Sequence, residues 1–123
     1  MVKIVGISRG ETRIGGDETV RYLAPELIET TAPMTTKSDV FSCAMLMLEC
    51  VTEEIPFSEL RRDSQVIHTR FIKRQRPPRP GGPDPKKRVD SDDLWNLMMR
   101  CWSEEPDRRP AMAEVHSFFL SHV

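Results

Sequence analysis

Two short segments that lie far apart in the chain constrain its fold more than any other feature. The first reads Arg21-Tyr22-Leu23-Ala24-Pro25-Glu26 and the second reads Pro106-Asp107-Arg108-Arg109-Pro110. Glu26 follows an Ala-Pro turn, and Arg109 precedes a proline that suits the first position of a helix. A carboxylate and a guanidinium in such places are natural partners for a bidentate ion pair. The sequence therefore predicts a contact between Glu26 and Arg109 that joins a loop to a helix terminus.

Length and composition indicate one small domain. The chain has 123 residues, of which 38% are hydrophobic, and its net charge is −1. This balance gives no general attraction to nucleic acid or to a membrane surface, and neither is expected as a partner. The three cysteines are odd in number and lie in apolar helical patterns without the paired spacing of a metal site. We expect no metal site, and we expect buried, reduced thiols.

A helix that begins near Thr36 is the strongest secondary-structure signal. Thr36 and Asp39 have the spacing of a capping box, and the next twelve residues are apolar on nearly every face. Such a helix belongs in the middle of a protein, and at about sixteen residues it is short for a membrane span. The sequence therefore predicts a central helix.

The C-terminal third predicts two further helices. Ser91 is placed to cap the first, whose opening turn is acidic. Pro110 suits the first position of the second, with a buried face of Met112, Val115, Phe118 and Phe119.

One stretch is interpreted as a loop, and a second, overlapping stretch carries an excess of positive charge on a helix face and a loop. Residues 76–90 hold five prolines and are expected to connect two helices, although Pro77-x-x-Pro80 also fits a polyproline ligand. Residues 61–88 hold ten of the eighteen basic residues and two acidic ones. We interpret the basic excess as a solvated surface, the alternative being a docking surface for an acidic peptide or a polyanion.

Several motifs together resemble the second half of a eukaryotic protein kinase domain. Residues 19–26, TVRYLAPE, resemble the end of that family's activation segment, and residues 38–42, SDVFS, resemble the start of its long central helix. Pro56-Phe57, Cys101-Trp102 and residues 106–110 follow in the family's order. The residues Val20-Arg21-Tyr22 and Cys101-Trp102 are most similar to those of the tyrosine-kinase-like serine/threonine group.

The resemblance implies a mainly α fold, the helical C-terminal lobe of a protein kinase. Residues 1–123 would be a partial kinase domain, with a degenerate start of the activation segment at 1–16, a substrate-side loop at 17–30 and the helical lobe at 36–120. A short β-strand at Val2–Ile7 would remain from the activation segment. In that family the residues matching Glu26 and Arg109 form a structural ion pair, and the one matching Asp39 accepts hydrogen bonds from the catalytic loop.

The resemblance also implies a substrate-side role for five residues. Thr19 would border the catalytic aspartate of a kinase, and the wall that reads the residue beside the phosphoacceptor would be formed by Val20, Arg21, Tyr22 and Leu23.

The catalytic parts of the family are not found in this sequence. Phosphoryl transfer in kinases uses a glycine-rich loop, a strand lysine, a catalytic-loop aspartate and asparagine, and a Mg²⁺-binding Asp-Phe-Gly. Where the last is expected, the chain reads Lys3-Ile4-Val5-Gly6, and no aspartate precedes the glycine. The parent family uses ATP and Mg²⁺; for this chain alone we expect no catalytic residue, no cofactor and no metal.

Two functional classes follow. In the first, the chain is the substrate-binding lobe of a kinase that phosphorylates Ser, Thr or Tyr of proteins, and is inactive alone. In the second, it is a non-catalytic helical interaction module or pseudokinase-like scaffold. A central helix that is apolar all round also predicts self-association or a protein partner through its uncovered surface. With no sorting signal in the sequence, a cytoplasmic location is expected.

Overall fold

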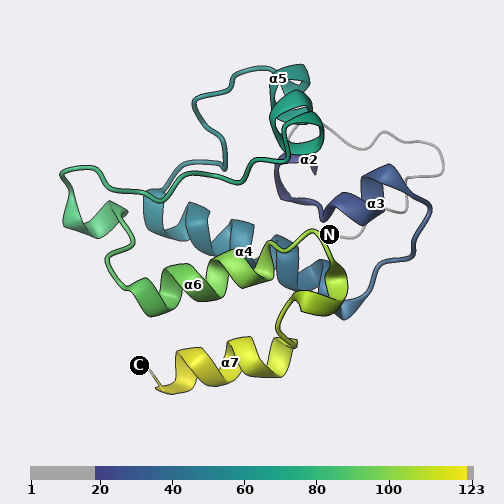
Figure 1. Cartoon of the computed structure of the whole chain (residues 1–123). Coiled ribbons are helices and arrows are strands. Elements are labelled where there is room, and N and C mark those ends of the chain that lie inside the picture. Colours follow the sequence, from purple (N-terminus) through teal and green to yellow (C-terminus); the bar gives the residue numbers. More distant parts are fainter. Residues whose placement is uncertain (1–18, 122–123) are drawn as a thin grey trace.

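The computed structural model describes residues 19–121, and these form a set of helices without a β-strand. The predicted strand at Val2–Ile7 lies outside the described residues. The mainly α fold is confirmed (Figure 1). In chain order the elements are α2 (Thr19–Tyr22), α3 (Pro25–Glu29), α4 (Thr36–Thr52), α5 (Asp63–Ile67), η1 (His68–Ile72), η2 (Pro85–Lys87), α6 (Asp92–Cys101), η3 (Pro106–Arg108) and α7 (Met112–Ser121).

Helix α4 is the predicted central helix, but its cap lies one residue earlier than expected. The Thr35 hydroxyl accepts a hydrogen bond from the Ser38 backbone N–H (3.2 Å), and the Ser38 hydroxyl accepts one from the Thr35 N–H (2.7 Å). The prediction with Thr36 and Asp39 was wrong because a serine hydroxyl serves as the return acceptor as well as a carboxylate does. Asp39 instead lies in the exposed first turn, where its charge favours the positive end of the helix dipole.

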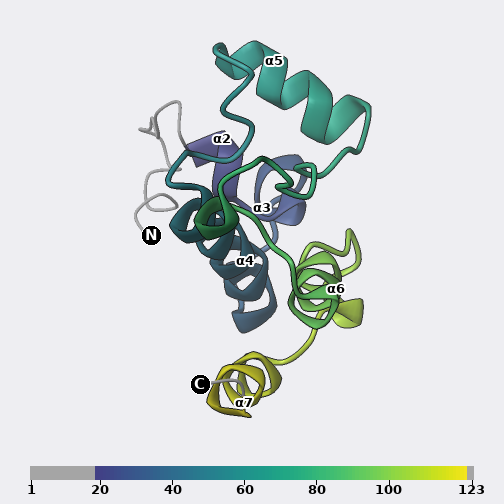
Figure 2. The ribbon, with the colours of Figure 1, turned by 90° about the vertical axis from the view of Figure 1, so that its left-hand side faces the viewer.

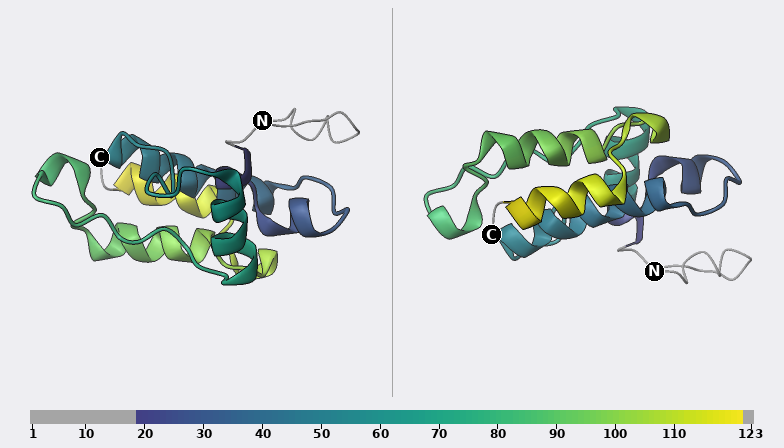
Figure 3. Two further views of the ribbon diagram at one scale, coloured as in Figure 1. Left: turned by 90° about the horizontal axis from the view of Figure 1, so that it is seen from above. Right: turned by 90° about the horizontal axis from the view of Figure 1, so that it is seen from below.

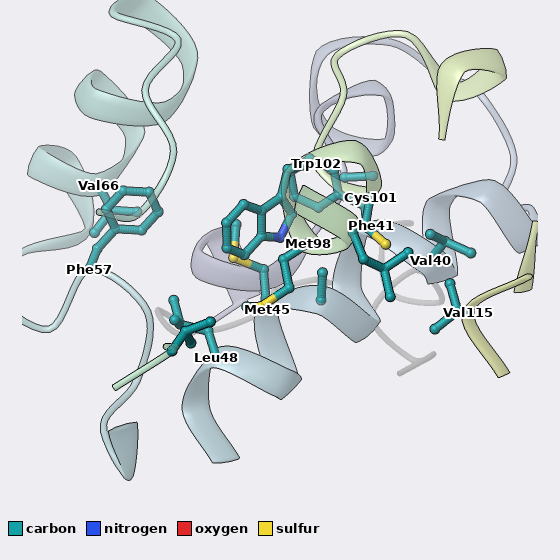
Figure 4. Close-up of a cluster of buried hydrophobic side chains, with 14 residues drawn as sticks. Val40, Phe41, Met45, Leu48, Phe57, Val66, Met98, Cys101, Trp102 and Val115 are labelled. Atoms are coloured by element: carbon teal, nitrogen blue, oxygen red, sulfur yellow. The ribbon is translucent and has the colours of Figure 1, made fainter. Parts of the chain in front are cut away.

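Helices α4, α6 and α7 lie side by side, with α6 running opposite to the other two (Figures 1 and 3). Figure 2 views the three nearly end-on, with α5 and α2 on the far side of α4 from α7. Trp102 packs against Met45 and Met98 in the middle of the core, and Phe57 lies beside Val66 of α5 (Figure 4). The fully buried side chains of α4 therefore lie in a helix that has other helices on two opposite sides.

Part of the predicted burial is not found. Pro110 precedes helix α7, which begins at Met112, and Met112 (37% exposed) and Phe119 (38% exposed) are only half covered. The reason is that α7 is the outermost helix, so only the side with Val115 meets the core. On α4, Leu46 is 53% exposed.

The cysteines also differ from the prediction of three buried thiols. Cys50 is exposed and Cys43 is half-buried, because α4 is not covered on every side. Only Cys101 is fully buried, and burial raises the pKa of its thiol to about 12, so that it stays protonated.

The proline-rich stretch is a connecting loop that is held against its own chain. Pro77 is buried, and the Arg79 guanidinium donates from Nε to the Val89 carbonyl (2.9 Å) and forms an ion pair with Asp92 (2.9 Å). Because a polyproline ligand must offer a free face, these contacts favour the loop interpretation over the ligand interpretation.

Helix α6 has the cap that the sequence predicts. The Ser91 hydroxyl accepts a hydrogen bond from the Leu94 N–H (3.1 Å). We expect Ser91→Ala to lower the free energy of unfolding by about 1 kcal/mol, because that N–H loses its partner. Urea unfolding measures the change. The control is Ser117→Ala inside α7, where alanine is the better helix former and should not destabilise. Equal losses in the two variants would contradict the capping role.

Candidate functional site

The predicted substrate-side residues are partly helical and partly buried. Thr19 begins helix α2, and Val20 is half-buried, with its carbonyl accepting a hydrogen bond from Arg70 Nη1 (2.7 Å). Leu23 is buried (7% exposed) beside the turn that starts α3. The segment expected to be a loop at 17–30 thus contains two short helices, since Pro25 sets the backbone angle for the first turn of α3.

Arg21 points into the protein. It is 4% exposed, and its guanidinium donates from Nη1 to the carbonyls of Pro56 (3.0 Å) and Phe57 (2.8 Å) and from Nη2 to that of Leu60 (2.8 Å). A planar guanidinium suits several acceptors in one loop because its donors have fixed directions. Arg21 therefore ties α2 to the Pro56–Leu60 turn.

Tyr22 is anchored to the central helix. Its hydroxyl donates to the Glu49 carboxylate, and its backbone carbonyl accepts a hydrogen bond from the Ser42 hydroxyl (3.0 Å). Both partners lie on α4, so the substrate-side segment has a fixed position relative to the core.

The structure brings Glu26 and Arg109 together. Arg109 Nη1 donates to Glu26 Oε2 (2.8 Å) and Nη2 donates to Oε1 (2.8 Å), which is the bidentate geometry expected from the sequence. The Arg109 side chain is fully buried, and that of Glu26 is 16% exposed.

Backbone groups complete the surroundings of Arg109. Its Nε donates to the Ser103 carbonyl (2.9 Å) and its Nη1 also reaches the Lys37 carbonyl (3.0 Å), while Lys37 Nζ donates to the Arg109 carbonyl (2.7 Å). The guanidinium thereby joins α3, the start of α4 and the segment before η3.

The ion pair sets the charge state of Glu26. Burial by itself would raise the pKa of this carboxyl, but the hydrogen bonds and the positive charge of Arg109 outweigh burial, and the pKa lies below the ordinary value of 4.5. Glu26 is therefore ionised at neutral pH, as a bidentate ion pair requires.

Asp39 has none of the contacts that the family resemblance implies. It is exposed in the first turn of α4, and within residues 19–121 no hydrogen bond or ion pair of its carboxylate is found. Its family role needs a catalytic loop, and that contact stays a prediction.

A cluster of arginines around Phe41 was not found by sequence reasoning. The guanidinium carbons of Arg70, Arg76 and Arg109 lie 5.0, 5.3 and 5.1 Å from the centre of the Phe41 ring. Arg70 is 1% exposed. The available signal was its spacing, since Arg70 follows the buried Val66 by four residues and so falls on the same helical face.

Ion pairs offset much of the basic excess between residues 61 and 88. Five of its basic side chains have acidic partners, and they are listed with those partners as follows: Arg74 with Glu29 and Glu104, Arg76 with Glu104, Arg79 with Asp92, Lys87 with Glu53, and Arg88 with Asp90. Because these pairs offset the positive charge, they favour a solvated surface over a polyanion site.

The described residues hold no metal-binding group and offer two open grooves. No cluster of three His, Cys, Asp or Glu residues within 19–121 could hold a metal ion. One groove, of about 560 Å³, lies between α6 and α7 and is crossed by the Arg100–Glu114 ion pair (2.7 Å). The other, of about 280 Å³, lies between Pro56 and the proline-rich loop. None of the described helices is long and apolar enough to cross a membrane.

The arrangement of a central apolar helix, an Ala-Pro-Glu segment and a buried arginine before the last helix defines the helical lobe of a protein kinase. Comparison with known families agrees: residues 5–119 match the family model of the protein tyrosine and serine/threonine kinase domain. The chain belongs to this family.

Curated relatives of the chain include both kinds of kinase. It is 34% identical over 101 residues to the serine/threonine/tyrosine-protein kinase HT1 of Arabidopsis thaliana, covering 82% of this chain and 24% of that protein. It is 32% identical over 112 residues to the human proto-oncogene tyrosine-protein kinase ROS, covering 85% and 4%. It is 33% identical over 114 residues to the serine/threonine-protein kinase STY17 of Arabidopsis thaliana, covering 89% and 18%. The chain thus spans less than a quarter of the length of these relatives.

Proposed function

We propose that this chain is the substrate-side helical lobe of a protein kinase and that it transfers no phosphoryl group by itself. The observation that supports the proposal is the family match together with the buried Glu26–Arg109 pair. On this proposal, residues 19–26 would lie where the family's substrate segment lies. Within that segment, Val20 and Tyr22 are the half-buried side chains that could contact a protein substrate. Arg21 and Leu23 would act by holding the segment in position.

The domain boundaries follow from the same proposal. Residues 36–120 would be the helical lobe, residues 17–30 the substrate side, and residues 1–16 a degenerate start of the activation segment. The family as a whole uses ATP and Mg²⁺. The Asp-Phe-Gly that holds Mg²⁺ in the family has no counterpart at Lys3-Ile4-Val5-Gly6, where it is expected. We therefore propose that the chain alone uses no cofactor.

A phosphotransfer assay tests this proposal. The purified chain, given radiolabelled ATP, Mg²⁺ and a mixed protein substrate, is expected to transfer no label above a blank without protein. Mg²⁺ and ATP together should also leave its midpoint of thermal unfolding unchanged, because a lobe without nucleotide-binding groups gains nothing from the ligand. Mg²⁺-dependent turnover, or a saturable shift with ATP, would show that this chain is an enzyme.

A second candidate function is a non-catalytic interaction module, and the exposed apolar side chains favour it. Leu46 on α4 and Leu120 on α7 are 53% and 64% exposed, and Phe119 is 38% exposed. Exposed apolar side chains can mark sites of association. We propose that the surface around Leu46 on α4 binds a protein, with self-association as the simplest case.

Sedimentation equilibrium tests the self-association. The chain is expected to form dimers or larger species at micromolar concentration, and Leu46→Glu should shift it toward monomer by placing a charge in the contact. Ile72→Glu is the matched control, since Ile72 is 69% exposed and lies on η1, a different helix from that of Leu46. A wild-type chain that is monomeric throughout, or equal effects of both substitutions, would reject this surface as the contact.

A further inference from the structure

Arg70 has a free pair of hydrogen-bond donors inside the protein. Its Nη1 donates to the Val20 carbonyl (2.7 Å), whereas Nε and Nη2 are buried and have no partner among the described residues. Nε and Nη2 form one edge of the guanidinium, and their N–H groups point in the same direction. That edge is the fork that binds the two oxygens of one carboxylate.

The described carboxylates near Arg70 are paired with other arginines. Arg109 is paired with Glu26 and Arg76 is paired with Glu104. Arg74 holds Glu29 and also contacts Glu104. Among residues 19–121 the cluster thus contains four guanidinium groups and three carboxylates, one negative charge fewer than the positive charges.

The surroundings of Arg70 make the missing charge costly. Its guanidinium carbon lies 4.7 Å from the centre of the Phe71 ring and 5.0 Å from that of the Phe41 ring, and both rings exclude water. Burial is the largest cause that lowers the pKa of Arg70, to about 9, and the charge of Arg76 adds to it. A buried cation without an anion is strongly unfavourable, whereas cation–π contacts recover only part of the lost hydration.

We propose that the Nε–Nη2 edge of Arg70 is a binding site for one carboxylate group. The two oxygens of the ligand accept the two free N–H groups, and its charge balances the cluster. A planar carboxylate fits this edge better than a spherical chloride ion, which cannot accept both N–H groups along their bond directions. The inference stands on this cluster alone and does not depend on the proposed function.

Surface ion pairs provide a way in. Arg74, whose side chain is 47% exposed, pairs with Glu29 (32% exposed) at 2.8 Å and with Glu104 (37% exposed) at 3.1 Å. Exposed pairs of this kind separate at little cost in water. On this proposal, the opening of these exposed pairs would let a small carboxylate reach the buried edge without unfolding of the core helices.

Acetate is the probe, with chloride at equal ionic strength as the comparison. At about ten times its dissociation constant, acetate is expected to raise the midpoint of thermal unfolding by roughly 5 °C in a saturable way. Chloride should give a much smaller shift. In NMR spectra the Nε–H resonance of Arg70, assigned by its absence in Arg70→Met, is expected to move as acetate is added.

Three variants separate a site at Arg70 from a general salt effect. Arg70→Met should lose the acetate response and Arg88→Met, in the partly exposed loop, should keep it. Arg70→Lys keeps the charge without the fork and should lose the preference for acetate over chloride. Should Arg70→Met fail to fold, the wild-type comparison and Arg70→Lys still decide.

The source of the carboxylate is tested with a short blocked peptide that carries one aspartate. A response to both probes means that an acidic side chain can occupy the site, and a response to acetate alone means that only small free carboxylates reach it. Either result supports the site. A wild-type response equal to that of Arg70→Met, or an Nε–H resonance that stays in place, overturns the proposal.

Discussion

Replacing Glu26 with glutamine is expected to lower the free energy of unfolding by about 3–5 kcal/mol, because it leaves the Arg109 charge buried without its anion. The Arg109 side chain has no exposed surface in which to regain hydration, and the two hydrogen bonds of 2.8 Å to Glu26 are charge-assisted. Urea unfolding followed by circular dichroism measures the loss. At this magnitude a lobe of marginal stability would be largely unfolded at room temperature.

The Arg100–Glu114 pair is the matched control. It is also bidentate, with distances of 2.7 and 3.2 Å, but both side chains are 50% exposed. Glu114→Gln should therefore change the stability far less than Glu26→Gln does. The double variant Glu26→Met with Arg109→Met should recover much of the loss, since it removes the unpaired charge. If Glu26→Gln proves no worse than Glu114→Gln, the pair is not the long-range contact that holds the lobe together.

The same ion pair predicts how stability depends on pH. Because the pKa of Glu26 is lower in the folded state than the ordinary 4.5, its contribution is fully present above the unfolded-state value. The contribution is lost as the pH falls below 4.5 and through the folded-state pKa. Unfolding curves measured from pH 7 downward should show this loss in the wild type, and the part due to Glu26 should be absent in Glu26→Gln. An unchanged acid dependence in the variant would contradict it.

The sequence was most informative where local signals and a long-range pattern agreed. The Ala-Pro turn before Glu26 and the proline after Arg109 predicted that these two residues pair. Prolines restrict the backbone beside both side chains, so the carboxylate and the guanidinium have few other partners to choose from. The central helix followed from its nearly continuous apolar run and the cap of α6 from Ser91. For these two helices, neighbouring residues alone determine the local geometry.

The remaining features depend on which surfaces meet in three dimensions. The apolar periodicity of α7 does not predict that Phe119 stays half exposed, because the exposure of Phe119 depends on how many other helices cover α7. The three hydrogen bonds from Arg21 to the carbonyls of Pro56, Phe57 and Leu60 join segments far apart in the sequence, and no local pattern indicates them. The cap of α4 was misplaced by one residue because Ser38 and Asp39 are both acceptable acceptors.

The second large effect on the free energy of unfolding is expected from replacing Phe41. Its ring is fully buried in the middle of α4, and three guanidinium groups lie about it, those of Arg70, Arg76 and Arg109. Phe41→Ala should lower the free energy of unfolding by about 3–5 kcal/mol, since it removes the ring from the core and leaves a cavity. Urea unfolding of the wild type and the variant gives the difference.

Phe41→Leu separates the volume of the side chain from the effect of its aromatic ring. A swap that nearly conserves volume costs less than about 1.5 kcal/mol in most cores, whereas loss of a desolvated cation–π contact costs up to about 2 kcal/mol. We therefore expect Phe41→Leu to cost up to about 3.5 kcal/mol, and more than the same substitution at a buried ring without arginines. The control is Phe57→Leu, at a ring that is 3% exposed and over which no guanidinium is found among the described residues. Equal costs at the two positions would mean that the arginines near Phe41 are held by their carboxylates and carbonyls alone, and that the ring acts only by filling space.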